Sequence, residues 1–164
     1  MSLELTGTAT ATLQSVARKV AHIPGALPRI ATAIARDAQA RVQLGFRKSA
    51  DPYGNAWAAL ISRDGKPLMN RGILANSFSA TAEGTTVRLG TNAPFADVHQ
   101  GGKVIVPRRA KALRFKIRGA WVTTKRVVIP ARPMVPTRAG GMPSKWSLGF
   151  VNIARTMVAQ VLRG

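Results

Sequence analysis

The chain has 164 residues, with 25 Lys and Arg against 6 Asp and Glu, a net charge of +19 and no cysteine. This length predicts one domain spanning 1–164, and a hydrophobic share of 46% is too high for a disordered basic tail. The lack of cysteine excludes disulfides, thiol nucleophiles and sulfur-ligated zinc. We therefore expect a folded domain with an unusually positive surface.

The charge is unevenly distributed along the chain. All six acidic residues lie in 1–100 together with 11 Lys and Arg, whereas 101–164 carries 14 Lys and Arg and no acid. Such a surface repels copies of itself, so a polyanion or an acidic partner is expected to neutralise it.

No segment predicts export or membrane insertion. The N-terminal residues show no basic stretch followed by an apolar one, and no apolar run approaches the roughly 18 residues of a membrane span. We expect a soluble, unexported protein that has no membrane partner.

Two helices are predicted at the start of the chain. Residues 10–22 have apolar side chains at helical spacing, and the proline-containing sequence at 23–28 is expected to interrupt the helix. A second helix should begin near Pro28 and end near Phe46. Its expected inward-facing residues are Leu27, Ile30, Ile34, Ala38 and Val42.

The middle of the chain changes from turn chemistry to an alternating pattern. Residues 47–76 contain Asp-Pro, Tyr-Gly-Asn and Asp-Gly-Lys-Pro, which predict a long loop with a short helical turn at 71–76. Apolar residues then alternate on both sides of Glu83-Gly84, between Phe78 and Leu89, and this pattern predicts a β-hairpin.

Residues 103–129 predict a basic two-stranded arm or the edge of a sheet. Three apolar residues alternate here with three cations, so one strand face is apolar and the other is positive. These residues are Leu113, Phe115 and Ile117 on one face, and Arg114, Lys116 and Arg118 on the other.

The last two segments are a bridge and a helix. Three prolines within 129–136 favour an extended strand that cannot form a regular ladder. Residues 144–163 then show a broad apolar stripe at helical spacing. The overall prediction is an α+β fold with two N-terminal helices, an antiparallel sheet with an extended basic hairpin, and a C-terminal helix.

Catalytic chemistry is poorly supported by the residues present. His22 is expected at a helix end, and His99, two residues after Asp97, has no evident third partner or metal ligand, so a structural role in a turn is favoured for it. No phosphate-binding loop, dinucleotide fingerprint or zincin motif is present. We predict no catalytic, cofactor or metal site and no small-molecule substrate.

The basic residues near the predicted arm are the strongest chemical signal. Their density suits phosphate neutralisation, and a solvated strand face is the alternative. Few aromatics accompany them, apart from Trp121, so any DNA contact is expected to be with the backbone and without sequence specificity. Trp57 and Trp146 are expected in the core or in a subunit interface. The predicted contacts to DNA or to an acidic partner are Lys103, Arg108, Arg109, Lys111, Arg114, Lys116, Arg118, Lys125 and Arg126, and Arg132 belongs to the same basic run.

Five motifs in this order resemble the phage virion morphogenesis, or tail completion, family of Mu-like and other tailed phages. They are DPYGNAWAAL at 51–60, RGIL at 71–74, VRLGTNAPFADVHQGG at 87–102, VPRRAKALRF at 106–115 and IPARPMVP at 129–136. Phe95 departs from the family, which often has tyrosine there, and the charge is unusually positive.

The resemblance implies a structural subunit that completes the tail and joins it to the head, forming a ring around the DNA channel, with a hexamer as the expected ring. It implies no cofactor, a location in the virion at the head–tail junction after assembly in the host cytoplasm, and contacts with tail-tube and neck or connector proteins and with packaged DNA. The residues that it marks for packing and assembly are Trp57, Phe95, His99, Gln100, Gly101, Pro130, Arg132 and Pro133.

Two functional classes remain open from the sequence, an assembly subunit and a free-standing nucleic-acid-binding protein. The same basic arm suits a free-standing, non-specific nucleic-acid-binding protein, although such a protein has no evident use for the 47–76 loop and the FADVHQGG turn. In an assembly subunit, we expect the arm and the loop at 47–70 to become ordered only when partners bind.

Overall fold

The structure is a computed structural model that describes the backbone of residues 7–163 and the side chains of residues 14–163. Helices occupy both ends of the chain, and three short β-hairpin segments lie between them. In chain order the elements are α1 (Gly7–Ala21), α2 (Ile23–Lys48), α3 (Ile73–Asn76), β1 (Phe78–Glu83), β2 (Thr86–Thr91), α4 (Ala96–Gly101), β3 (Lys103–Ile105), β4 (Leu113–Ile117), β5 (Ala120–Thr124), β6 (Val127–Ile129) and α5 (Ser144–Arg163). The predicted α+β class is confirmed.

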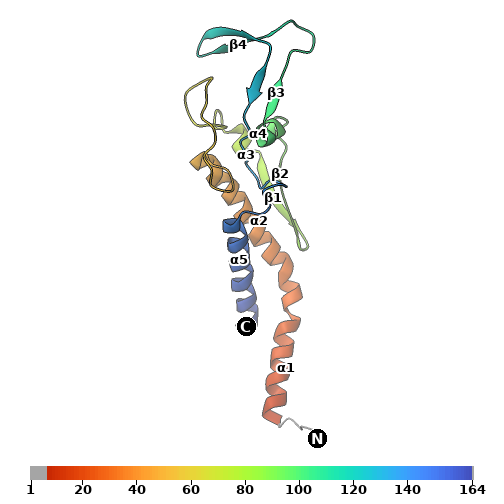
Figure 1. Cartoon of the computed structure of the whole chain (residues 1–164). Coiled ribbons are helices and arrows are strands. Elements are labelled where there is room, and N and C mark those ends of the chain that lie inside the picture. The colour runs from red at the N-terminus through yellow and green to blue at the C-terminus, as the bar shows by residue number, and fades with distance from the viewer. Residues whose placement is uncertain (1–6, 164) are drawn as a thin grey trace.

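Both predicted N-terminal helices are present, but the break between them was predicted in the wrong place, at 23–28. α1 already begins at Gly7, and α2 begins at Ile23, so that only His22 separates them. Pro24 is tolerated because it lies in the first turn of α2, where a backbone N–H has no intrahelical acceptor. Pro28 lies inside the helix. The two helices therefore form one long, bent rod (Figure 1).

The buried face of α2 differs from the predicted one at one position. Leu27 is 39% exposed, because the stripe that reaches the core passes through the small residue Ala26 instead. Ile34 is half-buried. The face is otherwise rich in alanine, which allows close packing, and its buried residues are Ala26, Ile30, Ala31, Ala35, Ala38, Val42 and Phe46.

The core lies at the C-terminal end of α2. The Phe46 ring contacts the Trp57 ring edge-on, with centroids 5.4 Å apart, and lies 5.8 Å from the ring of Phe78 in β1. Trp146 of α5 closes the same cluster and is 6% exposed. Trp57 and Trp146 are thus both core residues.

The strands form three antiparallel pairs, and all the predicted strand regions are present. β1 and β2 pair along their whole length, from Phe78 with Thr91 to Glu83 with Thr86, and pack on α2. β3 pairs with β6, and β4 with β5. These two pairs are the stem and the tip of one long arm formed by 103–129, which we call the β-arm.

The molecule is elongated. α5 packs beside α2, as its predicted range of 144–163 allows, while α1 extends beyond it at one end and the β-arm projects at the opposite end (Figure 1). The core between the two ends is where the motif segments meet.

Candidate functional site

The first candidate site is the place where three segments that are distant in sequence meet, which we call the motif junction. It consists of the start of the long loop at 49–60, the short helix α4 and the proline-rich segment 129–136. The Trp57 indole Nε1 donates a hydrogen bond to the Pro133 carbonyl at 2.9 Å, and the Trp57 backbone N–H donates to Ser49 at 2.8 Å. The loop is thus tied to both α2 and the proline-rich segment.

The Gln100 side chain of α4 forms hydrogen bonds with the proline-rich segment that a neighbouring β-strand would otherwise form. Its Oε1 accepts hydrogen bonds from the backbone N–H groups of Met134 and Val135, at 2.8 and 3.3 Å, and its Nε2 donates to the Val135 carbonyl at 2.8 Å. The carbonyl of His99 accepts from the Arg132 N–H at 2.7 Å. α4 therefore satisfies the backbone polar groups that a proline-rich strand cannot place in a ladder.

Arg132 is a buried cation, which the sequence-based grouping with the basic run did not foresee. It is 6% exposed, and its Nε and Nη2 donate to the carbonyls of Ala58 and Ala59 at 2.9 and 3.1 Å. Burial lowers the pKa of this guanidinium. Among residues 14–163, whose side chains are described, no carboxylate lies within ion-pair distance of it.

His99 lies beside Arg132 and against Phe95. The two rings meet edge-on with centroids 6.3 Å apart, and no described residue bonds the buried His99 Nδ1. Burial and, secondly, the nearby Arg132 charge hold the His99 pKa below its ordinary value of 6.5. The neutral imidazole is therefore favoured over the imidazolium. The described residues contain no cluster of three or more potential metal ligands.

The two glycines that follow Gln100 differ in the space available for a side chain. A Cβ on Gly101 would meet nothing within 4 Å, whereas one on Gly102 would lie 2.8 Å from the Ala131 backbone nitrogen. Gly102 also has a φ of +72°, which L residues rarely adopt. Of the remaining motif residues, Pro130 is exposed and Pro133 is half-buried.

A cavity of about 300 Å³ opens beside the motif junction, between α4 and the loop. Its walls are mainly apolar, and Arg132 and His99 line it. Sequence reasoning missed this cavity because its lining comes from 60–74, a loop without periodicity, as well as from α4 and the proline-rich segment.

Tyr53, the only tyrosine, is a second feature that sequence reasoning missed. Its hydroxyl accepts from the Thr137 N–H at 2.9 Å and donates to the Gly141 carbonyl at 3.0 Å. It ties the DPYGN turn to the segment that leads into α5. The signal available in the sequence was a large amphipathic side chain placed inside a turn motif.

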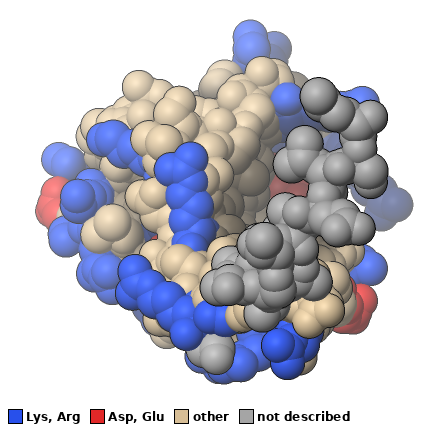
Figure 2. Space-filling view, turned by 90° about the horizontal axis from the view of Figure 1, so that it is seen from below, with Lys and Arg blue, Asp and Glu red and all other residues tan. Residues whose placement is uncertain are grey.

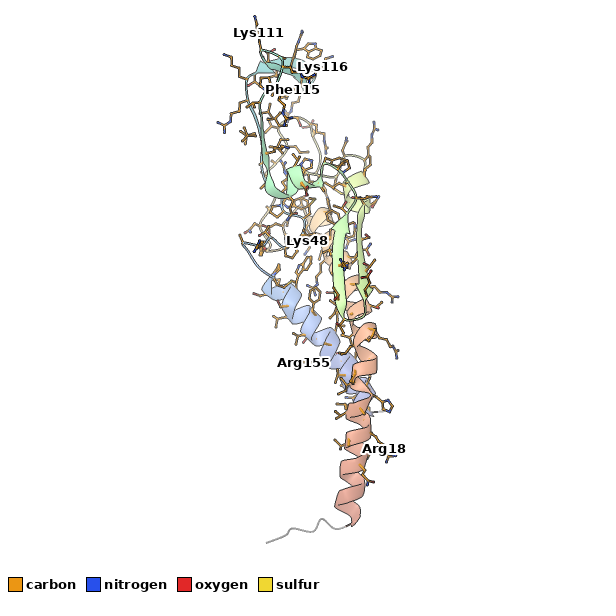
Figure 3. The ribbon with its side chains drawn as sticks, turned by 90° about the vertical axis from the view of Figure 1, so that its right-hand side faces the viewer. Arg18, Lys48, Lys111, Phe115, Lys116 and Arg155 are labelled. Atoms are coloured by element: carbon orange, nitrogen blue, oxygen red, sulfur yellow. The ribbon has the colours of Figure 1, made fainter. Side chains whose placement is uncertain are left out.

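The second candidate site is the exposed face of the β-arm. All nine cations predicted to contact DNA or an acidic partner are exposed. At the tip, the cationic groups of Arg114 and Lys116 lie 4.6 and 5.0 Å from the Trp121 ring centroid. Lys111, Phe115 and Lys116 mark the far end of the molecule in Figure 3.

The tip touches the body through the long loop. The turn between β4 and β5 places Arg118 and Gly119 at φ values of 48° and 87°, as a tight hairpin turn requires. Arg118 donates its backbone N–H to the Ser62 carbonyl at 3.4 Å, and its guanidinium pairs with Asp64 at 3.2 Å. The β-arm and the loop at 47–70, which were expected to become ordered only when partners bind, are therefore in contact in the structure.

Positive charge is not confined to the β-arm. Viewed from the helical end, Lys and Arg side chains surround the visible face, and Asp and Glu are sparse (Figure 2). The ion pairs among residues 14–163 are Arg41 with Asp37, Arg88 with Glu83 and Arg118 with Asp64. Most cations therefore lack an internal counter-charge.

These features fit a structural role, because the motif side chains at the junction hold backbone segments together and the nine predicted contact cations of the β-arm are exposed. The model of the phage virion morphogenesis family matches residues 7–163. The chain belongs to this family and is a bacteriophage structural protein associated with virion assembly. No curated protein and no solved structure matches it. No helix within residues 7–163 is long and apolar enough to cross a membrane.

Proposed function

We propose that this protein completes the phage tail and joins it to the head by forming a ring, expected to be a hexamer, around the DNA channel at the head–tail junction. Membership of the virion morphogenesis family supports the assembly role. The remainder of the proposal depends on the projecting β-arm.

The observation that carries the proposal is the uncovered apolar surface of the β-arm. Val106, Trp121 and Val128 are 54%, 58% and 59% exposed, and each pair of strands is only three to five residues long. An isolated two-stranded hairpin is marginally stable in water. Packing against neighbouring subunits would bury these side chains and the free strand edges, and a closed ring does this for every copy.

The positive charge fits the same role. Copies with a net charge of +19 repel one another, so a ring of them requires counter-charge from outside the chain. Packaged DNA or acidic tail-tube and connector proteins would supply it. We propose that the nine exposed cations of the β-arm make these contacts.

Cryo-electron microscopy of the head–tail junction in purified virions tests this function. The expected result is a ring of these subunits between head and tail tube, with the β-arm of each copy packed on its neighbour. Absence of the protein from the particle, or a position elsewhere in it, would contradict the proposal.

A non-specific nucleic-acid-binding role is the second candidate, and the arrangement at the arm tip favours it. Arg114 and Lys116 flank an exposed Trp121, a combination that suits phosphates and unstacked bases. Binding of the purified protein to a short duplex, measured against salt concentration, tests this role. The slope of log K against log salt is negative, and each lost phosphate contact makes it shallower by about 0.9.

The matched comparison uses two triple variants with equal loss of charge. Arg114→Gln, Lys116→Gln and Arg118→Gln change the arm, while Lys19→Gln, Arg36→Gln and Arg155→Gln change the helices. A reduced slope in the arm variant alone would support nucleic-acid contact by the tip. Equal slopes in both variants would indicate diffuse charge attraction and would remove the tip as a specific site.

A further inference from the structure

We infer that the cavity beside α4 receives a carboxylate side chain from an acidic neighbouring protein in the assembled particle, with Arg132 as its ionic partner. This inference rests on the proposed assembly role and names the chemistry of one contact within it. The inference depends on three features, namely an incompletely paired cation, a cavity that reaches it, and the absence of acid among the described residues that line the cavity.

Arg132 has a donor to spare. Its Nε and Nη2 are bonded to backbone carbonyls, and no hydrogen bond joins its Nη1 to any described residue. Among the described residues, His99 Nδ1 is the buried side-chain atom that has no hydrogen-bond partner, so the unbonded Nη1 of Arg132 is not sealed from solvent, and Arg132 lines the cavity. A carboxylate that entered the cavity and reached Nη1 would form a charge-assisted hydrogen bond with it.

The cavity leads from the surface to this cation. Leu60, Leu68, Ile73 and Phe95 form its apolar walls, and Arg63 and Arg71 add further positive charge to the lining. Its volume of about 300 Å³ suits a single side chain with its neighbouring backbone. The Arg63 guanidinium donates through both Nη1 and Nη2 to the carbonyls of Asp64 and Lys66, whereas Nη1 of Arg132 is not bonded to any described residue.

The apolar walls favour a protein carboxylate over a nucleic-acid phosphate. A backbone phosphate is flanked by other phosphates, whose charges would have to approach leucine and isoleucine side chains. An Asp or Glu side chain beside an apolar residue carries one charge at its end and can bury its methylene groups against Leu60 and Ile73. The chain itself has only six acids, and none of the five that lie within residues 14–163 lines the cavity, so an acidic protein of different sequence is the expected source.

The direct test uses a small probe that has one carboxylate, N-acetylglutamate N′-methylamide, titrated into the purified protein. The ¹⁵N and ¹H shifts of the Arg132 Nε–H and the titration of the His99 imidazole are followed by NMR. We expect saturable shifts at Arg132 and a rise in the His99 pKa, because a nearby negative charge favours the imidazolium. The glutamine analogue of the probe should cause neither effect.

Two results would overturn the inference. One is the absence of saturable shifts, or equal shifts from the glutamine analogue. The other is saturation at Arg132 by methyl phosphate but not by the carboxylate probe, which would assign the cavity to nucleic acid.

A pair of exposed isoleucines provides variants that leave the buried arginine intact. Ile73→Trp fills the cavity from its lining, whereas Ile61→Trp adds the same bulk at a position that does not line the cavity; the two residues are 59% and 82% exposed. Probe binding should weaken at least about tenfold in Ile73→Trp and stay unchanged in Ile61→Trp. Equal binding by the two variants would contradict the cavity as the site.

The two proposals fail separately. A ring in the virion without probe binding would leave the proposed function standing and remove the cavity contact. Probe binding by a protein that forms no ring would show a carboxylate site and remove the proposed function.

Discussion

At the scale of single residues, the motif junction solves a problem that proline creates. Pro130, Pro133 and Pro136 have no backbone N–H, so the segment that contains them cannot complete a strand ladder. The N–H groups of Arg132, Met134 and Val135 are nevertheless all bonded, to the His99 carbonyl and the Gln100 side chain. α4 and the proline-rich segment are therefore mutually dependent.

Gln100→Ala should destabilise the protein by about 2 kcal/mol, because it leaves two backbone N–H groups and one carbonyl without partners. Chemical denaturation monitored by tryptophan fluorescence measures this change. Gln160→Ala, at an exposed position of α5, is the control and should change stability by no more than about 0.5 kcal/mol. Equal effects of the two variants would mean that the Gln100 hydrogen bonds do not hold the segment.

Gly102→Ala should cost about 3 kcal/mol or more, since the added Cβ meets backbone atoms of Ala131 and Ile129 and the positive φ excludes ordinary side chains. Gly101→Ala is the neighbouring control, because a Cβ there meets nothing within 4 Å. Thermal unfolding of both variants distinguishes the two positions. Similar melting temperatures would show that the close approach at Gly102 can relax.

His99 should make stability depend on pH. Its pKa in the folded protein lies below the ordinary 6.5, so the unfolded chain binds more protons over this range, and stability should fall as pH decreases through about 6.5. Denaturation curves between pH 8 and pH 5 for the wild type and His99→Gln test this. The variant should lose part of the slope, and a slope unchanged in His99→Gln would contradict the assignment.

At the scale of elements, periodicity predicted most of the fold, and competing local rules explain where it failed. The alternation at Leu113, Phe115 and Ile117 predicted β4, because a strand exposes its two faces in turn. The break predicted at 23–28 was wrong, because Pro24 falls in a first turn, where proline costs little. Proline in a sequence marks a missing N–H, and its distance from the helix start decides whether that absence removes a helical hydrogen bond.

The candidate site was less predictable than the fold. The sequence marked Trp57, Gln100 and Arg132 through resemblance, but could not show that they converge, since they come from three segments joined only by tertiary contacts. It also grouped Arg132 with exposed cations, because charge patterning does not reveal burial. The residues that line the cavity show no periodic pattern in the sequence.

The β-arm should exchange amide hydrogens much faster than α2 in the isolated protein. The two strand pairs of the arm expose apolar side chains. The contacts of Arg118 at the tip with the long loop are a backbone hydrogen bond to Ser62 at 3.4 Å and an exposed ion pair with Asp64, which protect little. By contrast, Val42 and Phe46 of α2 are 1% exposed. Hydrogen–deuterium exchange with mass spectrometry measures this directly. Strong protection of 113–124 in a free monomer would show that the arm does not need neighbours to become ordered.

At the scale of the whole molecule, net charge should oppose self-association. An increase in ionic strength from 0.1 M to 1 M shortens the Debye length from about 10 Å to about 3 Å, which screens repulsion between copies. The average mass in sedimentation experiments should therefore rise with salt, and the arm variant with Arg114, Lys116 and Arg118 changed to Gln should associate at lower salt. A mass that falls with salt would indicate that the copies attract one another through opposite charges.

The long helical rod also has a mechanical consequence. α1 and α2 together extend over about 60 Å. Near the C-terminal end of α2, the Phe46 ring contacts the Trp57 ring, and Trp57 donates a hydrogen bond to the Pro133 carbonyl in the segment that follows the β-arm. We therefore expect a displacement of α1 to be passed through these contacts toward the arm. The helix is interrupted at His22, so bending at this point would reduce the displacement that reaches the other end of the subunit.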